Sequence, residues 1–264
     1  MKRKLTRVFL GLVMAVCTIA KDFSGKPEAK APAAQTSSSA PTVDQVLEKY
    51  VQGLGGKAAI EKVKTRIMKG SIELPATGDA GSIVPGTIEI YMKAPDKRMS
   101  VVNIPGSGID QRGFNGSTGW YVDPDEGPKN LGGQDLANIK LESDFYRELR
   151  LKELYHGMTL QGKENFGKSP VYVISAQLAD GSSAKLYFDA QTGLLVREDV
   201  PVETEDGRTM MQSTFEDYKD VDGVKLPFTI HRTRPDSDST LRFAEIKNNV
   251  PIDDAKFNKP VGQK

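Results

Sequence analysis

The feature that most constrains the fold is a change of hydrophobic period at Lys64. From there on, apolar and polar residues alternate, as in "GTIEIYMKA" (residues 86–94), and turn residues recur roughly every eight to twelve positions. Alternation of this kind places one set of side chains on each face of a β-strand. We therefore expect a mainly β fold with about ten or eleven antiparallel strands between Lys64 and Lys247.

Three related turns divide this region. They are "FNGSTGW" (114–120), "FDAQTGL" (188–194) and "YKDVDGV" (218–224), each with an aromatic residue, a polar stretch, a glycine and an apolar residue. Glycine accepts the positive φ that hairpin loops need, and Asn115 and Asp189 can accept hydrogen bonds from their own turns. The turns are irregularly spaced, so we interpret them as local hairpins of a meander and as scaffold.

Apolar residues at helical spacing appear in two places. "TVDQVLEKYVQGLGG" (residues 42–56) has the i, i+3, i+4 spacing of an amphipathic helix, with a capping box between Thr42 and Gln45. The pair Gly55-Gly56 ends this helix, and a short second helix is expected over about 57–63. Helical spacing returns over about 134–155, where we expect one helix or two short ones.

The start of the chain reads as an export signal. "MKRKLTR" is basic and "VFLGLVMAVCTIA" is apolar, so residues 1–20 are expected to be removed by cleavage after Ala20. The alternative is lipidation at Cys17, because "VMAVC" resembles a lipobox apart from Val16. The expected location is the periplasm, or a tether to the outer membrane through a lipidated Cys17.

The next segment has the composition of a flexible linker. Residues 21–41 are rich in Pro, Ala, Ser and Lys and poor in large apolar side chains. The expected folded domain then covers residues 42–260. Removing the signal takes away four of the 36 basic residues and none of the 35 acidic ones. The domain therefore lacks the basic excess typical of nucleic-acid binding, and no such partner is expected.

Residues that could carry chemistry are sparse. The only cysteine is Cys17, and His156 and His231 have no ligand at metal-binding spacing. The glycine-rich stretches match neither a phosphate-binding loop nor a dinucleotide fingerprint, and no G-x-S-x-G nucleophile motif occurs. We expect no enzyme activity, catalytic residue, metal or cofactor. A hydrolase built around one of the two histidines is the enzymatic alternative.

Several longer stretches together resemble a known family. They are "FNGSTGWYVDP", "VYVISAQLADGSSAKLYFDAQTGLLVRED", "VDGVKLPFTI" and "NNVPIDDAKFNKP". The pattern resembles the periplasmic lipoprotein carriers and outer-membrane lipoprotein-sorting proteins, the LolA-like proteins, over residues 42–260. The resemblance implies a curved antiparallel half-barrel with helices over an apolar concave face. Carriers of this kind accept acyl chains and pass them on without chemistry.

The resemblance also implies where a ligand would lie. A lipid, a lipoprotein acyl chain or another apolar ligand is expected against apolar side chains of the concave face, and an ordinary core is the alternative interpretation of the same residues. The expected ligand-binding residues are Ile90, Met92, Phe114, Trp120 and Met158.

Two further expectations concern closure and partners. The carriers hold their lid closed with an arginine, and Arg66 and Arg98 lie in the corresponding region, outside any motif that matches. An envelope protein is the other expected partner. A structural or interaction module of an envelope complex with the same fold is therefore the alternative function.

Overall fold

The computed structural model describes residues 40–75, 83–123, 125–204, 207–235 and 237–261. Within these ranges the strands form one antiparallel sheet in the order β6-β5-β4-β3-β2-β1-β13-β12-β11-β10-β9-β8-β7. Their bounds are β1 (Thr65–Pro75), β2 (Ile83–Lys93), β3 (Lys97–Ile104), β4 (Gly108–Asn115), β5 (Gly119–Asp123), β6 (Gly127–Asn130), β7 (His156–Phe166), β8 (Ser169–Gln177), β9 (Ser183–Asp189), β10 (Leu195–Thr204), β11 (Gly207–Val221), β12 (Val224–Arg234) and β13 (Ser237–Asn248).

The sheet is an open meander. The chain adds strands outward from β1 to β6, crosses over through helices, and returns from β7 to β13, which pairs with β1. β6 and β7 are the two edges, so the sheet does not close on itself. The mainly β, antiparallel prediction is thus confirmed.

The predicted strand number was too low. The described residues form thirteen strands, against an expected ten or eleven. Strand β6 explains part of the difference, because it is four residues long and contains Gly127, Pro128 and Asn130. Glycine, proline and asparagine are depleted from strands and mark turns, so the sequence here predicts a loop.

The helices lie near the expected positions. They are α1 (Val43–Gly53), α2 (Lys57–Lys62), α3 (Gly133–Ser143) and α4 (Leu151–Leu154), with 3₁₀ turns η1 (Arg147–Leu149) and η2 (Asp254–Phe257). The capping box is confirmed, because the Thr42 side chain accepts from Gln45 N and the Gln45 side chain accepts from Thr42 N. No helix among the described residues has both the length and the apolarity to cross a bilayer. The predicted signal, Ala20 and Cys17 lie outside the described residues.

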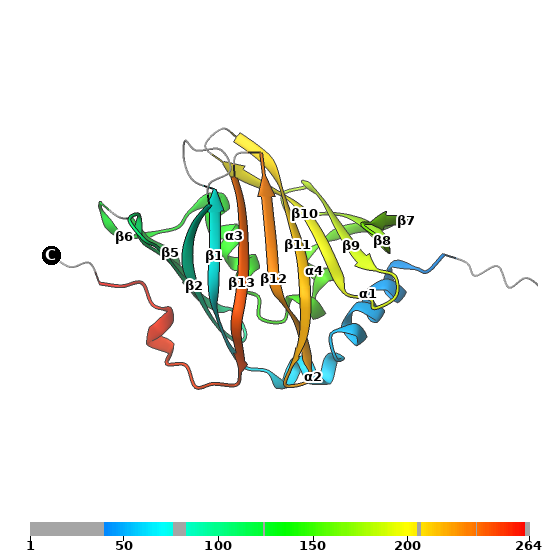
Figure 1. The fold of residues 1–264 in the computed structure, drawn as a ribbon, viewed down its shortest axis with the longest axis horizontal. Helices are drawn as coiled ribbons and strands as arrows, with labels where there is room; N and C mark the ends of the chain where they lie inside the picture. The colour runs from blue at the N-terminus through cyan, green and yellow to red at the C-terminus, as the bar shows by residue number, and fades with distance from the viewer. Residues whose placement is uncertain (1–39, 76–82, 124, 205–206, 236, 262–264) are drawn as a thin grey trace, which may run out of the picture. The chain divides into compact units, whose positions relative to one another are not determined.

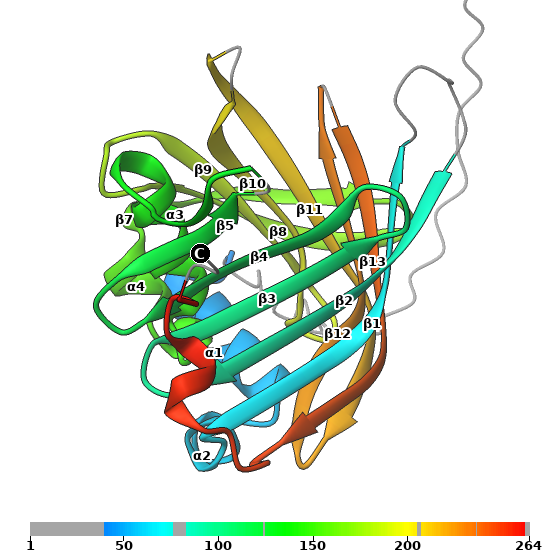
Figure 2. The same cartoon turned by 90° about the vertical axis from the view of Figure 1, so that its left-hand side faces the viewer.

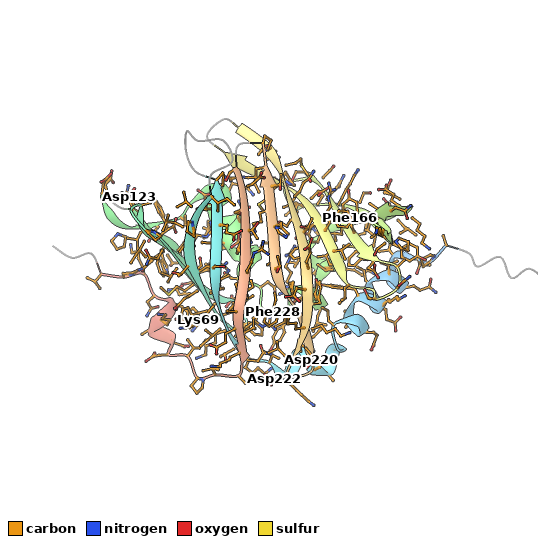
Figure 3. All side chains as sticks on the ribbon, in the orientation of Figure 1. Lys69, Asp123, Phe166, Asp220, Asp222 and Phe228 are labelled. Atoms are coloured by element: carbon orange, nitrogen blue, oxygen red, sulfur yellow. The ribbon has the colours of Figure 1, made fainter. Side chains whose placement is uncertain are left out.

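One face of the sheet curves around the helices. Figures 1 and 2 show α1, α3 and α4 on the inner side of the curve. The main apolar core lies between this concave face and the helices, and it includes Val46 and Tyr50 of α1 and Leu151 of α4. Phe228 of β12, labelled in Figure 3, packs against it. Burial of this core is the main stabilisation that holds the helices on the sheet.

The turns have the predicted chemistry. In the β9–β10 turn, Asp189 Oδ1 accepts from Gln191 N at 3.0 Å and from Thr192 N at 2.7 Å. Asp220, at the β11–β12 turn in Figure 3, accepts from Gly223 N at 3.0 Å. These bonds satisfy turn amides that no strand partner reaches, which confirms the assignment as local hairpins.

Candidate functional site

The candidate site is the concave face of the sheet beneath the helices. Strand register puts Ile90 opposite Met68 and Ser100, and Met92 opposite Arg66 and Arg98. Paired residues share a face, and residues two apart along a strand share it too. Ile90 is buried in the main core, and Met92 packs against that core. The concave face at β1–β3 therefore combines apolar side chains with two arginines.

Two other expected ligand-binding residues lie on the same side. Phe114 of β4 pairs with Arg98 and is buried. Met158 of β7 packs against the main core from the opposite end of the sheet. The structure thus gathers four of the five expected residues around the concave face, although they are spread over its width rather than joined in one pocket.

Trp120 does not lie with the others. It pairs with Gly113, which pairs with Met99, and this row faces the convex side of the sheet. There it belongs to a separate small core with Met99 and Phe257, and its Nε1 donates to Phe257 O at 2.8 Å. The C-terminal segment packs against Trp120 through Phe257, so the position of Trp120 does not suit it to a concave ligand site.

Helix α3 is attached to the concave face by a partly buried charge cluster. Glu142 of α3 accepts two hydrogen bonds of 2.9 Å from Arg112 Nη2. Arg98 Nη1 lies 3.5 Å from the same carboxylate and 3.1 Å from Ser100 Oγ. Both arginines come from strands of the sheet, so Glu142 links helix α3 to the sheet through two ion pairs.

The surroundings set the charge states in this cluster. Burial favours the neutral acid, but Arg98, Arg112 and Arg232 outweigh it and lower the pKa of Glu142 to about 2. Burial lowers the pKa of Arg98 to about 10, and Glu142 works against that decrease. Glu142 and Arg98 are therefore both charged at neutral pH, and three arginines lie close enough to act on one carboxylate.

A second charged contact attaches the segment after α3. Arg147 of η1 forms an ion pair with Glu198 of β10, and Tyr155 donates to the same carboxylate. Arg147 Nη2 also donates to Tyr155 Oη at 2.8 Å. Among the described residues, Arg147 Nε and Arg232 Nε are buried without an acceptor.

A small cavity lies inside the concave face, between α1, the η1–α4 segment and β10–β12. Its volume is about 90 Å³, and its lining includes Arg66, Arg147, Glu148, Phe215 and Leu226. Ligand pockets typically measure about 300–1,000 Å³, so this cavity is too small for an acyl chain in the described conformation.

A larger groove lies on the other side of α1. It measures about 490 Å³ and runs between α1 and the β9–β10 turn, with Gln45, Glu48, Lys49, Tyr172 and Asp189 in its lining. The lining also includes the buried apolar residues Val46 and Phe188. The volume of the groove falls within the usual range of ligand pockets, whereas the volume of the inner cavity does not.

Other chemistry finds little support. In the described ranges, no three His, Cys, Asp or Glu side chains gather in a way that could hold a metal ion. His156 lies on edge strand β7 and is exposed. His231 Nδ1 lies 3.0 Å from Thr240 Oγ1 and its Nε2 lies 3.5 Å from Glu216. His231 and its two neighbours lie on strands outside the linings of the two cavities described above.

Sequence reasoning selected Arg98 but missed its partner Glu142, and it also missed Glu198. Arg98 carries a usable signal, because it alternates with Ser100 and Val102 on an inward-facing row. A charged residue at an inward position needs a partner. The identity of that partner depends on how α3 returns over the sheet, which the sequence pattern does not specify.

Solved structures share this architecture. A DUF1329 family protein from Desulfovibrio piger matches with a TM-score of 0.58 at 14% identity, covering 83% of this chain and 98% of that one. A LolA superfamily protein from Nitrosomonas europaea matches with a TM-score of 0.57 at 17% identity, covering 83% of this chain and 99% of that one. A domain from Vibrio parahaemolyticus named for outer-membrane lipoprotein sorting has a TM-score of 0.56 at 14% identity, covering 81% of this chain and 97% of that one.

These likenesses confirm the resemblance to LolA-like proteins at the level of fold. No protein-family model and no curated protein matches the sequence. At identities of 14–17% the shared property is the curved sheet with its helices.

Proposed function

We propose that this protein binds an apolar ligand, such as a lipid or a lipoprotein acyl chain, on the concave face of its sheet and beneath its helices. It holds the ligand without chemical change. We also propose that it is an exported envelope protein, which is where a lipoprotein-sorting fold and an export signal would serve such a ligand. The supporting neighbour is the Vibrio parahaemolyticus domain named for lipoprotein sorting.

One observation carries the proposal. The main apolar core lies between the concave face and the helices. Helix α3 contacts the sheet through a charged cluster as well as through Leu136 and Ile139, and we propose that the helices separate from the sheet when a ligand enters. When the helices move away, side chains such as Ile90 and Met92 become available to a ligand. Each buried CH₂ contributes about 0.8 kcal/mol, so an acyl chain of ordinary length can replace the contacts that opening removes.

The described conformation is then the closed one. Its 90 Å³ cavity cannot hold a chain, so ligand entry and opening of the helices are coupled. Arg98 and Arg112 on the sheet and Glu142 on α3 supply a contact that can break and re-form in water at modest net cost, since charges regain hydration when they separate.

The test uses a neutral apolar probe and two matched variants. Met92 and Val101 are half-buried apolar residues of adjacent strands on opposite faces. Met92→Lys places a charge in the proposed site, and Val101→Lys places it on the convex face. We expect N-phenylnaphthylamine fluorescence to report binding at least tenfold weaker for Met92→Lys and unchanged for Val101→Lys. Circular dichroism confirms that both variants are folded.

Equal loss in both variants, or no binding by the wild type, would contradict the proposal. A second candidate then gains support, namely a structural or interaction module that uses the same fold. The small volume of the inner cavity is the observation that favours it, because a filled core needs no ligand. That candidate predicts a stable protein partner and no bound lipid.

A further inference from the structure

Two arginines on the concave side form no ion pair with a described residue. Five arginines point from the strands or from η1 into this region, and three of them form the ion pairs described above. The other two, Arg66 and Arg232, form no ion pair with any described residue. A charge buried without a counterion is costly, and a protein that bound only neutral chains would gain nothing from it.

Arg66 is the more deeply buried of the two. Its residue is 8% exposed, and burial lowers the pKa of its guanidinium. Its Nε donates to Asn248 Oδ1 at 3.0 Å, and the guanidinium carbon lies 5.5 Å from the centre of the Phe145 ring. Asn248 is fixed in turn by a 3.0 Å bond to Val221 O. The groups that hold Arg66 in place are therefore neutral, and neither of them carries a compensating charge.

The 90 Å³ cavity adjoins this guanidinium. At about 30 Å³ for each molecule in liquid water, its volume corresponds to about three waters, which suits a small head group but not a chain. Leu151, Leu195 and Phe215 form apolar parts of its lining. Glu148 also lines the cavity and stabilises the charge of Arg66 from a distance, but it forms no ion pair with it.

We propose that this cavity holds the anionic head group, a carboxylate or a phosphate, of an amphiphile whose apolar part enters the concave chamber, with Arg66 as the cation that binds it. The proposal rests on the function proposed above and specifies its ligand class. A guanidinium forms strong, charge-assisted hydrogen bonds to carboxylate and phosphate oxygens, which explains why an arginine would stay buried here.

Arg232 provides a matched control. It lies on the same face as Ile230 of β12, also without an ion-pair partner among the described residues, but the cavity lining does not include it. It lies close enough to Glu142 to lower the pKa of that carboxyl, which places it in the α3 cluster rather than at the cavity. Comparing substitutions of the two arginines therefore distinguishes a general effect of losing a positive charge from the loss of a specific anion site.

The experiment measures Kd for three ligands with the same twelve-carbon chain: dodecanoate, dodecyl phosphate and methyl dodecanoate. The full chain is compared with Arg66→Gln, Arg66→Lys and Arg232→Gln, and displacement of N-phenylnaphthylamine reports binding. We expect the wild type to bind at least one anionic ligand ten or more times more tightly than the ester. The preferred anion distinguishes a carboxylate head group from a phosphate.

We expect Arg66→Gln to reduce this preference to twofold or less, Arg66→Lys to retain at least threefold, and Arg232→Gln to retain at least fivefold. Equal affinity of the wild type for anions and ester overturns the anion site while the proposed function stands, and this result does not depend on any variant folding. Loss of the preference in Arg232→Gln but not in Arg66→Gln overturns the assignment to Arg66. Absence of binding for all three ligands overturns the proposed function and this proposal with it.

Discussion

Replacement of Glu142 by glutamine tests how strongly helix α3 is attached to the sheet. The variant keeps the size of the side chain and removes the charge that Arg98 and Arg112 share. The pKa of Glu142 is about 2, against about 4.3 for an unperturbed glutamate, a difference of about two units at about 1.4 kcal/mol each. We therefore expect Glu142→Gln to lower the free energy of unfolding by about 3 kcal/mol at pH 7.

A second argument gives a similar magnitude. Removing one partner of a buried ion pair typically costs about 3–5 kcal/mol, because the other charge stays buried. Glu142 is 29% exposed and Arg98 is 9% exposed, so water reaches the glutamate side of the pair. The low end of the range therefore applies, which agrees with the loss of about 3 kcal/mol expected from the lowered pKa of Glu142.

The pH dependence has a fixed sign. The folded state lowers the pKa of Glu142, so its contribution is fully present above about pH 4.3 and is lost as the pH falls toward 2. Urea unfolding of wild type and variant should differ by about 3 kcal/mol at pH 7, and the difference should shrink below pH 4.3. Hydrogen exchange should show faster opening of α3 in the variant.

The control is Glu153→Gln. Glu153 forms an exposed pair with Arg150, with 63% of its side chain exposed, and such pairs contribute about 0–1 kcal/mol. A loss in Glu142→Gln no larger than in this control, or unchanged exchange of α3, would refute the assignment of Glu142 as the attachment point.

Two other substitutions test the scaffold. Gly55→Ala should lower the free energy of unfolding in urea by about 3 kcal/mol or more, because Gly55 has φ +119° and a Cβ there would lie 2.0 Å from Gly223 O. A decrease below about 1 kcal/mol would show that this close approach does not constrain the fold. Trp120→Phe should lower the free energy of unfolding by about 2 kcal/mol, because it removes the hydrogen bond to Phe257 O. It should leave N-phenylnaphthylamine binding unchanged, and weaker binding would place Trp120 in the ligand site.

The sequence predicted the parts of this fold that depend on neighbours along the chain. The capping box between Thr42 and Gln45 and the self-capped turn at Asp189 involve residues two or three apart, so their geometry follows from local pattern. The alternation in β2 likewise predicted that Ile90 and Met92 share a face. These features need no knowledge of how distant segments pack.

The placement of Trp120 could not be predicted in this way. Strand β5 reads "GWYVD", with apolar residues at consecutive positions, so alternation does not indicate which side is concave. The side of the sheet on which Trp120 lies depends on Phe257, which belongs to the distant C-terminal segment and packs against the convex face. The pairing of Glu142 with Arg98 and Arg112 depends in the same way on the path of α3 over the sheet.

The central claim is that the concave face binds an apolar ligand. Native mass spectrometry of the full protein, purified without detergent from the cells that make it, tests this claim most directly. We predict one lipid bound per chain, retained in the folded protein and released on unfolding. A folded protein whose mass is that of its polypeptide alone, or of a stable complex with another protein and no lipid, would contradict the claim.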